Sequence, residues 1–313
     1  MSLTVVGSIA FDSVRTPFGE RERMLGGSAV HFSLAASFFT EARIVGPVGD
    51  DFGSEELAVL EGRGVITDDI ERVAGGETFF WRGHYDYDMN VAHTDDTQLN
   101  VFGAFEPKLS QASRRAQMLF LGNIQPQLQA EVRGGCREAE FAALDSMNLW
   151  IETEREALVA AIAEVDCVLL NDAEIRALTE EPNLARAARK VMAIGPEVVV
   201  AKRGEYGAAL FTAEEFFAIP GYLLETVRDP TGAGDSFAGG FLGYLDSRRA
   251  TGAPLLAHGT LRQAMAYGSV LASFNVEDFG TERVASLTIE EIEDRLRDLR
   301  RLTEFEVEPA EAG

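Results

Sequence analysis

The chain has 313 residues, of which 46% are hydrophobic, and carries a net charge of −23. This acidity disfavours nucleic acid or an anionic membrane as the main partner. The two cysteines are isolated and the four histidines lack metal-motif spacing, which argues against structural zinc and fits a reducing compartment. No apolar run approaches the roughly 18 residues of a membrane span, which argues against a membrane helix. We expect a cytoplasmic protein with a large core.

The first 76 residues predict alternating strands and helices. Residues 3–9 are typical of a buried strand, residues 26–39 of a glycine turn leading into an apolar helix, residues 42–48 of a strand, and residues 54–64 of a helix ended by glycine. Such alternation is typical of a sheet covered by helices. We therefore expect an α/β fold with a mostly parallel central sheet flanked by helices.

Residues 77–105 interrupt this pattern. They are rich in aromatic and charged side chains, including Trp81, Tyr85 and Tyr87, and alternate in part between apolar and polar positions. We predict strands outside the main sheet that pair with residues 11–25 and form a small β-sheet lid. The aromatic side chains could stack on a nucleobase, or simply fill the lid or a dimer interface.

Regular alternation returns after residue 105. The pattern predicts strands at 118–122, 167–171 and 197–202, another strand ending near 149–150, a hairpin of 208–211 and 216–219, and helices at 154–163, 172–179, 184–194, 255–274 and 290–302. The acidic tail 304–313 is expected to be disordered. We assign residues 1–10, 26–76 and 106–303 to the α/β domain, and residues 11–25 and 77–105 to the lid.

Residues 228–242 read Arg-Asp-Pro-Thr-Gly-Ala-Gly-Asp-Ser-Phe-Ala-Gly-Gly-Phe-Leu. A bare glycine loop that leads into a helix aims free N–H groups and the positive end of the helix dipole at one point, which indicates a phosphate or other anion site. A carboxylate such as Asp235 repels an anion bound beside it, so its presence there indicates a chemical role. The role that we expect is to accept a proton from an attacking hydroxyl. An ordinary capped helix is the alternative, although Gly239, Gly240 and Gly243 indicate that another segment packs close to the helix backbone.

Several further polar residues follow predicted strands. They are Asp12, Gln125, Asn171 and Lys202. Ligands bind beyond the carboxyl ends of parallel strands, so we expect these side chains to lie near Asp235 at one edge of the sheet. A turn, a helix cap or a charged surface position is the alternative for each.

The sequence Asp-Pro-Thr-Gly-Ala-Gly-Asp-Ser-Phe at 229–237, with Gly-Gly-Phe-Leu at 239–242, resembles the C-terminal signature of the ribokinase-like (pfkB-type) carbohydrate kinases. The resemblance spans nearly the whole chain. It implies a ribokinase-like fold and transfer of the γ-phosphate of ATP, with Asp235 as the catalytic base and the backbone of Gly232, Ala233 and Gly234 as the anion hole.

The same resemblance implies substrate contacts in the N-terminal part. Asp12 would bind sugar hydroxyls, and the Gly26-Gly27 turn resembles the N-terminal signature of the family. His31 departs from that signature, which usually has Asn there; a core histidine is the alternative. Gln125 is a further substrate candidate at the same edge.

Nucleotide contacts are implied in the C-terminal part. Asn171 and Glu174 resemble the Asn-x-x-Glu element, with Glu174 facing Mg²⁺ through water. Lys202 and Gly204 would meet the ATP phosphates, and Asn275 would lie at the adenine site. Two positions in the signature, Asp229 and Thr231, match a monovalent-cation site, which would bind K⁺.

We therefore expect an ATP- and Mg²⁺-dependent kinase that phosphorylates a primary hydroxymethyl group of a sugar. A nucleoside kinase of the same family is the alternative, suggested by the aromatic lid and by residues 273–277, which resemble archaeal nucleoside kinases. A sugar-binding regulator without catalysis is a third hypothesis, which the intact Asp235 disfavours. A homodimer formed through the lid is a further expectation.

Overall fold

The computed structural model describes residues 3–304, so the acidic tail expected at 304–313 lies, apart from Glu304, outside the described residues. Within them, a nine-stranded main sheet has the order β13-β12-β11-β10-β9-β8-β1-β4-β5. Neighbouring strands are parallel except in the pairs β11–β12 and β12–β13. The strands are β1 (Leu3–Val6), β4 (Ala42–Val48), β5 (Ile66–Arg72), β8 (Met118–Leu121), β9 (Phe141–Leu144), β10 (Cys167–Asn171), β11 (Val198–Lys202), β12 (Ala208–Phe211) and β13 (Phe216–Ile219).

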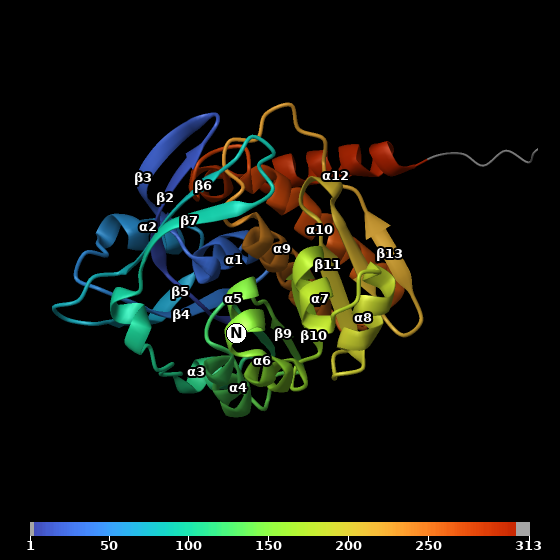
Figure 1. Ribbon diagram of the computed structural model, residues 1–313, viewed down its shortest axis with the longest axis horizontal. Helices are drawn as coiled ribbons and strands as arrows, with labels where there is room; N and C mark the ends of the chain where they lie inside the picture. Colours follow the sequence, from blue (N-terminus) through green and yellow to red (C-terminus); the bar gives the residue numbers. More distant parts are fainter. Residues whose placement is uncertain (1–2, 305–313) are drawn as a thin grey trace, which may run out of the picture.

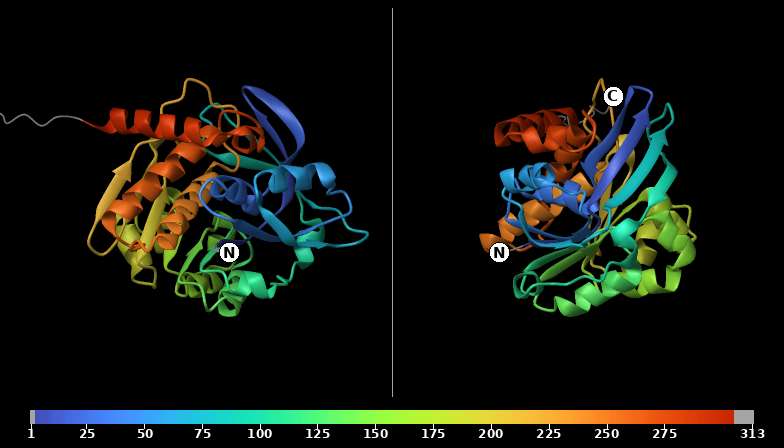
Figure 2. Two further views of the ribbon diagram at one scale, coloured as in Figure 1. Left: turned by 180° about the vertical axis from the view of Figure 1, so that it is seen from behind. Right: turned by 90° about the vertical axis from the view of Figure 1, so that its left-hand side faces the viewer.

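Helices cover both faces of the main sheet, each face with its own hydrophobic cluster (Figures 1 and 2). One layer holds α1 (Ser28–Ala36), α2 (Ser54–Gly62), α9 (Ala233–Ala250), α10 (His258–Asn275), α11 (Glu282–Ser286) and α12 (Ile289–Thr303). The other holds α3 (Gln111–Arg114), α4 (Pro126–Gly135), α5 (Asn148–Thr153), α6 (Arg155–Ile162), α7 (Asp172–Thr179) and α8 (Leu184–Met192). None of the described helices is long and apolar enough to cross a membrane.

Helix α9 packs unusually closely against its neighbours α1 and α10. A Cβ on Gly239 would overlap the carbonyl oxygen of Phe32, and one on Gly243 would lie 2.9 Å from the Cα of Ala36. The glycines inside α9 therefore let α1 approach its backbone. This close approach holds the start of α9, and the loop before it, against the rest of the domain.

A second, four-stranded sheet has the order β3-β2-β6-β7 and stands apart from the main sheet (Figure 1). We call it the lid sheet; its strands are β2 (Ala10–Thr16), β3 (Gly19–Gly26), β6 (Phe79–Tyr85) and β7 (Ala92–Gln98). Only its central pair, β2–β6, is parallel. The fold class expected from the sequence is thus confirmed: a mostly parallel sheet flanked by helices, with a smaller separate sheet.

The prediction of a strand ending near residues 149–150 is wrong. Leu149 and Trp150 lie in α5, and the strand at this place in the sheet is β9. This strand has only four residues, Phe-Ala-Ala-Leu, of which two are alanines that favour helix over strand. The edge strand β5 is not predicted from the sequence, because its charged residues obscure the apolar alternation.

Candidate active site

The anion loop, residues 229–234, leads directly into α9. Gly232 is the N-cap residue of α9 and has a φ of 75°, in the left-handed region that favours glycine. A Cβ at this position would also overlap the imidazole ring of His31. The buried carboxylate of Asp229 accepts a hydrogen bond of 2.9 Å from the backbone N–H of Thr231. The loop is therefore held in one conformation from both sides.

The backbone N–H groups expected to form the anion hole are not equivalent. The N–H of Ala233 donates to the carbonyl of Pro230 at 3.2 Å. Those of Gly232 and Gly234 are better placed to bind a ligand anion at the positive end of the α9 dipole. The helix is 18 residues long, so its N-terminus carries the full terminal dipole.

Asp235 lies in the first turn of α9 and is partly exposed. Loss of water contact and the negative charge of Asp145 together raise the pKa of its carboxyl from 3.8 to about 7, with Lys202 opposing the shift. A carboxylate with a pKa near the working pH is suited to general base catalysis. The position beside the anion loop is the one that such a base requires.

Asp12 lies on β2, buried against the Gly26-Gly27 turn. A Cβ on Gly26 would overlap its carboxylate, and the backbone of Gly27 donates a hydrogen bond to it. Burial, together with the nearby charges of Asp229 and Asp235, raises the pKa of Asp12 to about 7. The structure therefore brings the acid of the first sequence motif to the two acids of the last.

His31 forms a buried brace with Asn275. The amide nitrogen of Asn275 donates to the carbonyl of Thr231 at 2.7 Å, so its oxygen is the acceptor for Ser236 Oγ, at 3.0 Å, and for His31 Nδ1, at 2.9 Å. His31 Nδ1 therefore carries the proton and Nε2 is a bare acceptor. Burial lowers the pKa of His31 to about 4, so the ring is neutral at pH 7.

This brace corrects the expectation for Asn275. Its side chain is fully buried and hydrogen-bonds α1, α9 and the anion loop, so it does not line an adenine site. His31 is also nearly fully buried, and its Nε2 has no hydrogen-bond partner among the described residues. Both residues hold the anion loop in place.

A cationic centre lies on the other side of Asp235. Lys202 ends β11, and its Nζ is 2.6 Å from the carboxylate of Asp145, which follows β9. The ammonium also lies against Gly234, 3.1 Å from where a Cβ would be. The charges of Asp145 and Glu174 both raise the pKa of Lys202 and keep it protonated. Sequence reasoning missed Asp145; the available signal was a single acid directly after a buried strand.

Asn171 and Glu174 form a reciprocal capping box at the start of α7. The side-chain oxygen of Asn171 accepts from the N–H of Glu174 at 2.8 Å, and Glu174 Oε2 accepts from the N–H of Asn171 at 2.7 Å. Burial and the charge of Asp145 together raise the pKa of Glu174 to about 7. The capping alternative is therefore present, and Glu174 still reaches the charged centre around Lys202.

Gln125 makes no side-chain contact with the other candidate residues among the hydrogen bonds of residues 3–304. It is the exposed N-cap residue of α4, and its side chain caps nothing. The buried glutamine of this segment is Gln129, whose Nε2 donates to the carbonyls of Gly122 and Asp145 at 2.8 Å each. The expectation that Gln125 contacts the substrate stays a prediction, whereas Gln129 holds together the ends of β8 and β9.

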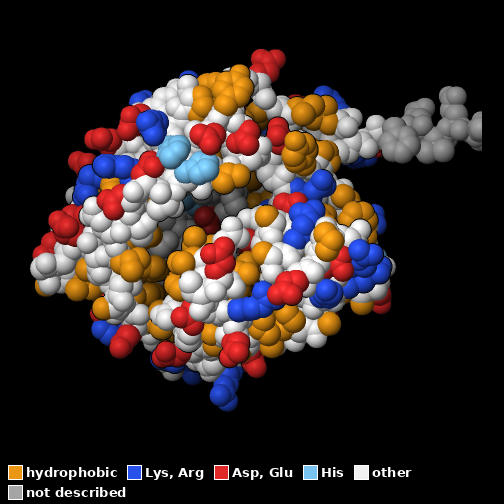
Figure 3. Space-filling view, in the orientation of Figure 1, with side chains coloured by type: hydrophobic (Ala, Val, Ile, Leu, Met, Phe, Trp, Pro, Cys, Tyr) orange, Lys and Arg blue, Asp and Glu red, His pale blue; other side chains and the backbone are white. Residues whose placement is uncertain are grey.

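The lid sheet reaches across to the other half of the site. Tyr85 Oη lies 3.2 Å from Thr231 Oγ1 in the anion loop. At the turn after β6, Asn90 donates to Glu205 at 3.3 Å and lies against Gly204, whose φ is 56°. Gly204 is thus a left-handed turn under the end of the lid. Figure 3 shows this face of the molecule hollowed, with acidic side chains visible in the hollow.

A family model described as "pfkB family carbohydrate kinase" matches residues 4–287. The chain belongs to this family. Membership makes it an ATP-dependent phosphotransferase, a carbohydrate or nucleoside kinase, and the anion loop with Asp235 lies within the matched residues.

Similar proteins are nucleoside and sugar kinases. A cytidine kinase of Thermococcus kodakarensis is 28% identical over 79% of this chain and 90% of its own length. An ATP-dependent ribose-1-phosphate kinase of Halopiger xanaduensis is 29% identical over 69% of this chain and 72% of its own. The solved structure of a Burkholderia thailandensis nucleoside kinase in complex with inosine has a TM-score of 0.78 at 20% identity, covering 95% of this chain and 97% of that one.

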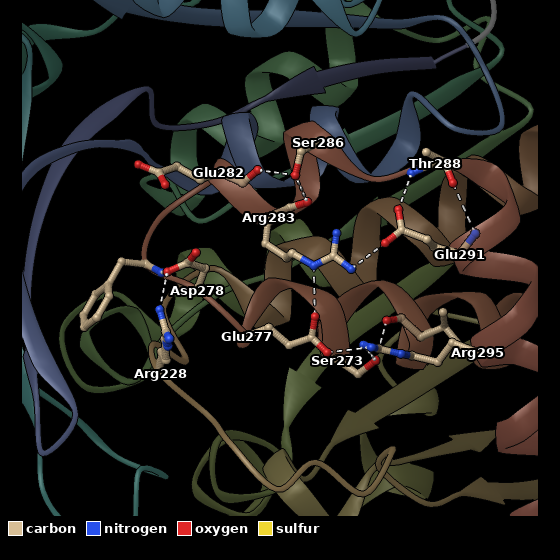
Figure 4. A network of polar contacts seen from close by, with 12 residues as sticks. Arg228, Ser273, Glu277, Asp278, Glu282, Arg283, Ser286, Thr288, Glu291 and Arg295 are labelled. Carbon is tan, nitrogen blue, oxygen red and sulfur yellow. Dashed lines mark hydrogen bonds and ion pairs between the residues drawn. The ribbon is translucent and has the colours of Figure 1, made fainter.

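In this pfkB kinase, an ion-pair network fixes the segment that follows α10 (Figure 4). Glu277 accepts from Arg283 at 3.0 Å and from Arg295 at 2.5 Å, which ties α10 to α11 and α12. The guanidinium of Arg295 stacks over the ring of Phe274, 3.4 Å from its centre. The stretch 273–277 therefore anchors the end of α10 behind the brace of Asn275.

Proposed function

We propose that this pfkB kinase is a nucleoside kinase, transferring the γ-phosphoryl group of ATP to a primary hydroxymethyl group of a nucleoside. The observation that carries the kinase chemistry is Asp235, a partly exposed carboxylate with a pKa near 7 beside the anion loop. Two observations favour a nucleoside over a plain sugar: the aromatic side chains of the lid sheet, and the similarity to a cytidine kinase over 90% of that protein.

The chemistry follows from the positions of these groups. Asp12 accepts hydrogen bonds from substrate hydroxyls and holds the substrate above the anion loop. Asp235 takes the proton of the attacking hydroxyl. The N–H groups of Gly232 and Gly234 and the dipole of α9 stabilise the negative charge of the transferring group. The fixed ammonium of Lys202 faces the ATP phosphates, and orientation of the two substrates supplies much of the remaining rate.

Residues of this chain fit Mg²⁺ held mainly by ATP. Glu174 Oε1 is free of the capping box, whereas the described residues contain no cluster of three acidic, histidine or cysteine side chains arranged around a metal. Such a donor set suits an ion that keeps its own waters and the phosphate oxygens. Glu174 would hold the hydrated ion, and the bound ion would neutralise phosphate charge.

The monovalent-cation site remains a prediction. Both carboxylate oxygens of Asp229 accept backbone hydrogen bonds, from Thr231 at 2.9 Å and from Gly280 at 3.1 Å. Each oxygen keeps a second lone pair, so the buried carboxylate could still bind K⁺. The division into α/β domain and lid, with closure that excludes water from the phosphoryl group, and a homodimer formed through the lid, likewise remain proposals.

A sugar kinase is the second candidate, since the similar ribose-1-phosphate kinase acts on a ribose derivative without a base. A panel of cytidine, inosine, ribose, ribose 1-phosphate and fructose, read as ADP release with ATP and Mg²⁺, distinguishes the candidates. We expect the highest kcat/KM with a nucleoside and phosphorylation at its 5′ hydroxyl. A preference for ribose or fructose over both nucleosides would overturn the assignment, and no turnover of any hydroxyl substrate would favour the non-catalytic regulator.

A further inference from the structure

One face of β6 carries three residues toward the substrate side of the lid sheet. Side chains alternate along a strand, so Trp81, Gly83 and Tyr85 share a face. The pairing of β6 with β2 is regular and places Trp81 directly beside Asp12. Paired residues of parallel strands lie on the same face, and Asp12 is the buried acid of the substrate site.

Tyr85 shows independently that this face looks onto the reacting groups. Its hydroxyl lies 3.2 Å from Thr231 Oγ1. The tyrosine is also close enough to Asp12, Asp229 and Asp235 for all three charges to raise its pKa, in addition to the effect of burial. Trp81, four residues earlier on the same strand face, therefore borders the same hollow.

The position of the indole depends on the glycine two residues later. A Cβ on Gly83 would overlap the six-membered ring of Trp81, so that ring lies across the strand where a side chain would otherwise begin. Its Nε1–H donates to Thr94 Oγ1 of β7 at 3.1 Å. The ring is thus held over the strand by a hydrogen bond at one edge and a glycine beneath the other, and it remains half-buried.

A partly exposed indole fixed in this way is a flat apolar surface next to the carboxylate of Asp12. A tryptophan that only filled the lid would be covered by neighbouring side chains, and it would not require a glycine beneath it. A nucleoside presents the matching pair of groups, a ribose with hydroxyls and a flat neutral base. A plain sugar would leave the indole surface in contact with water.

We propose that Trp81 is the base-stacking residue of this kinase and that Gly83 makes room for it. The inference rests on the proposed nucleoside kinase function and specifies how the nucleoside is distinguished from a plain sugar. It places the base against Trp81, on the face of β6 that also carries Gly83 and Tyr85, and the ribose at Asp12.

Kinetics with matched variants test this assignment. We expect Trp81→Ala to raise KM for cytidine or inosine by about 5- to 150-fold, equivalent to roughly 1–3 kcal/mol at 1.4 kcal/mol per tenfold, with a smaller change in kcat. Trp81→Phe should restore much of the affinity because it keeps a ring. Gly83→Ala should mimic Trp81→Ala by displacing the indole. Arg82→Ala, an exposed neighbour on the opposite face, is the control and should leave KM unchanged.

A binding measurement gives a readout that does not depend on turnover. The chain has two tryptophans, Trp81 and Trp150, so Trp150→Phe leaves Trp81 as the single indole and Trp81→Phe leaves Trp150. We expect inosine or cytidine to quench the fluorescence of the Trp150→Phe variant and not that of the Trp81→Phe variant. Ribose should quench neither.

The possible failures are distinguishable. Suppose that the wild-type chain phosphorylates nucleosides. If Trp81→Ala then leaves KM unchanged for both nucleoside and ribose, or changes both by the same factor, the stacking role is wrong and the nucleoside kinase function stands. If the wild-type chain phosphorylates ribose and no nucleoside, the proposed function is wrong, and the stacking role with it. Thermal unfolding of each variant shows whether the lid sheet has folded, and Gly83→Ala tests the role with the tryptophan still present.

Discussion

The candidate site has two halves, the edge of the main sheet and the lid sheet, which contribute different kinds of side chain. The edge of the main sheet contributes charges: Lys202 is enclosed by Asp145, Glu174 and Asp235, and its ion pair with Asp145 is largely shielded from water. The lid sheet contributes one acid, Asp12, and otherwise aromatic rings and hydroxyls on a sheet whose outer strand β7 is almost fully exposed. Phosphoryl transfer needs fixed charges, whereas substrate choice needs a surface that can be altered without disturbing them.

Few hydrogen bonds join the two halves. Tyr85 reaches Thr231, Asn90 reaches Glu205 at 3.3 Å, and Thr16 donates to the carbonyl of Arg228 at 2.9 Å. By contrast, the anion loop is held to its own half by the brace of Asn275 and by close packing of glycines in α9. Changes in the charged half should therefore impair the reaction itself, and changes in the lid should mainly impair substrate affinity.

Replacement of Asp235 by Asn gives the largest expected effect. The amide preserves shape but cannot accept the hydroxyl proton, so kcat should fall by about 10²- to 10⁴-fold. Nucleoside and ATP affinity, measured by calorimetry, should stay within a few-fold of wild type, because neither substrate depends on this proton acceptor for binding. A variant that retains near-normal kcat would remove Asp235 from its role as base.

Substitution of Lys202 and substitution of Asp145, the two partners of one ion pair, should shift the pH dependence of kcat/KM in opposite directions. Lys202→Met should lower kcat/KM for ATP by about 10- to 150-fold, because a hydrogen bond to a charged group contributes about 1.5–3 kcal/mol. The wild-type profile of kcat/KM should rise with pH through about 7, where Asp235 ionises and where the pKa values of Asp12 and Glu174 also lie. Because Lys202 lowers the pKa of Asp235 and Asp145 raises it, Lys202→Met should move this limb to higher pH and Asp145→Asn to lower pH.

A matched control for this pair is Arg203→Met, which removes a positive charge from the adjacent, exposed position. It should leave both the pH profile and kcat/KM close to wild type. Shifts of the limb in the same direction for Lys202→Met and Asp145→Asn would contradict the arrangement, because they would indicate a general loss of structure instead of two opposite charges acting on one carboxyl.

The same division explains what could be predicted from the sequence. The anion loop and Asp235 are contiguous, so the glycines, the helix start and the acid can be recognised together. Asp12 and Lys202 each follow or lie within a strand whose end could be located. The fold class also follows from the alternation of strands and helices, which is a local property.

The residues that were missed or misplaced depend on long-range packing. Asp145 follows a strand of four residues, two of them alanine, which carries almost no strand signal. His31 and Asn275 are 244 positions apart, and they meet because α1 and α10 both pack against α9. The face of Trp81 likewise depends on the register between β2 and β6, and no pattern within β6 alone specifies that register.

Removal of the Tyr85 hydroxyl gives the smallest expected effect and tests the lid half most directly. Tyr85→Phe deletes one hydrogen bond between the lid sheet and the anion loop and keeps the ring. Such a bond contributes about 0.5–1.5 kcal/mol, so KM for the nucleoside should rise by about 2- to 12-fold with little change in kcat. Asn90→Ala, which removes the hydrogen bond between the lid sheet and Glu205, should act in the same direction. A contact that only docks the lid affects substrate affinity and leaves the reaction rate of the bound substrate unchanged. A fall of 100-fold or more in kcat for Tyr85→Phe would therefore place this hydroxyl in the phosphoryl-transfer step.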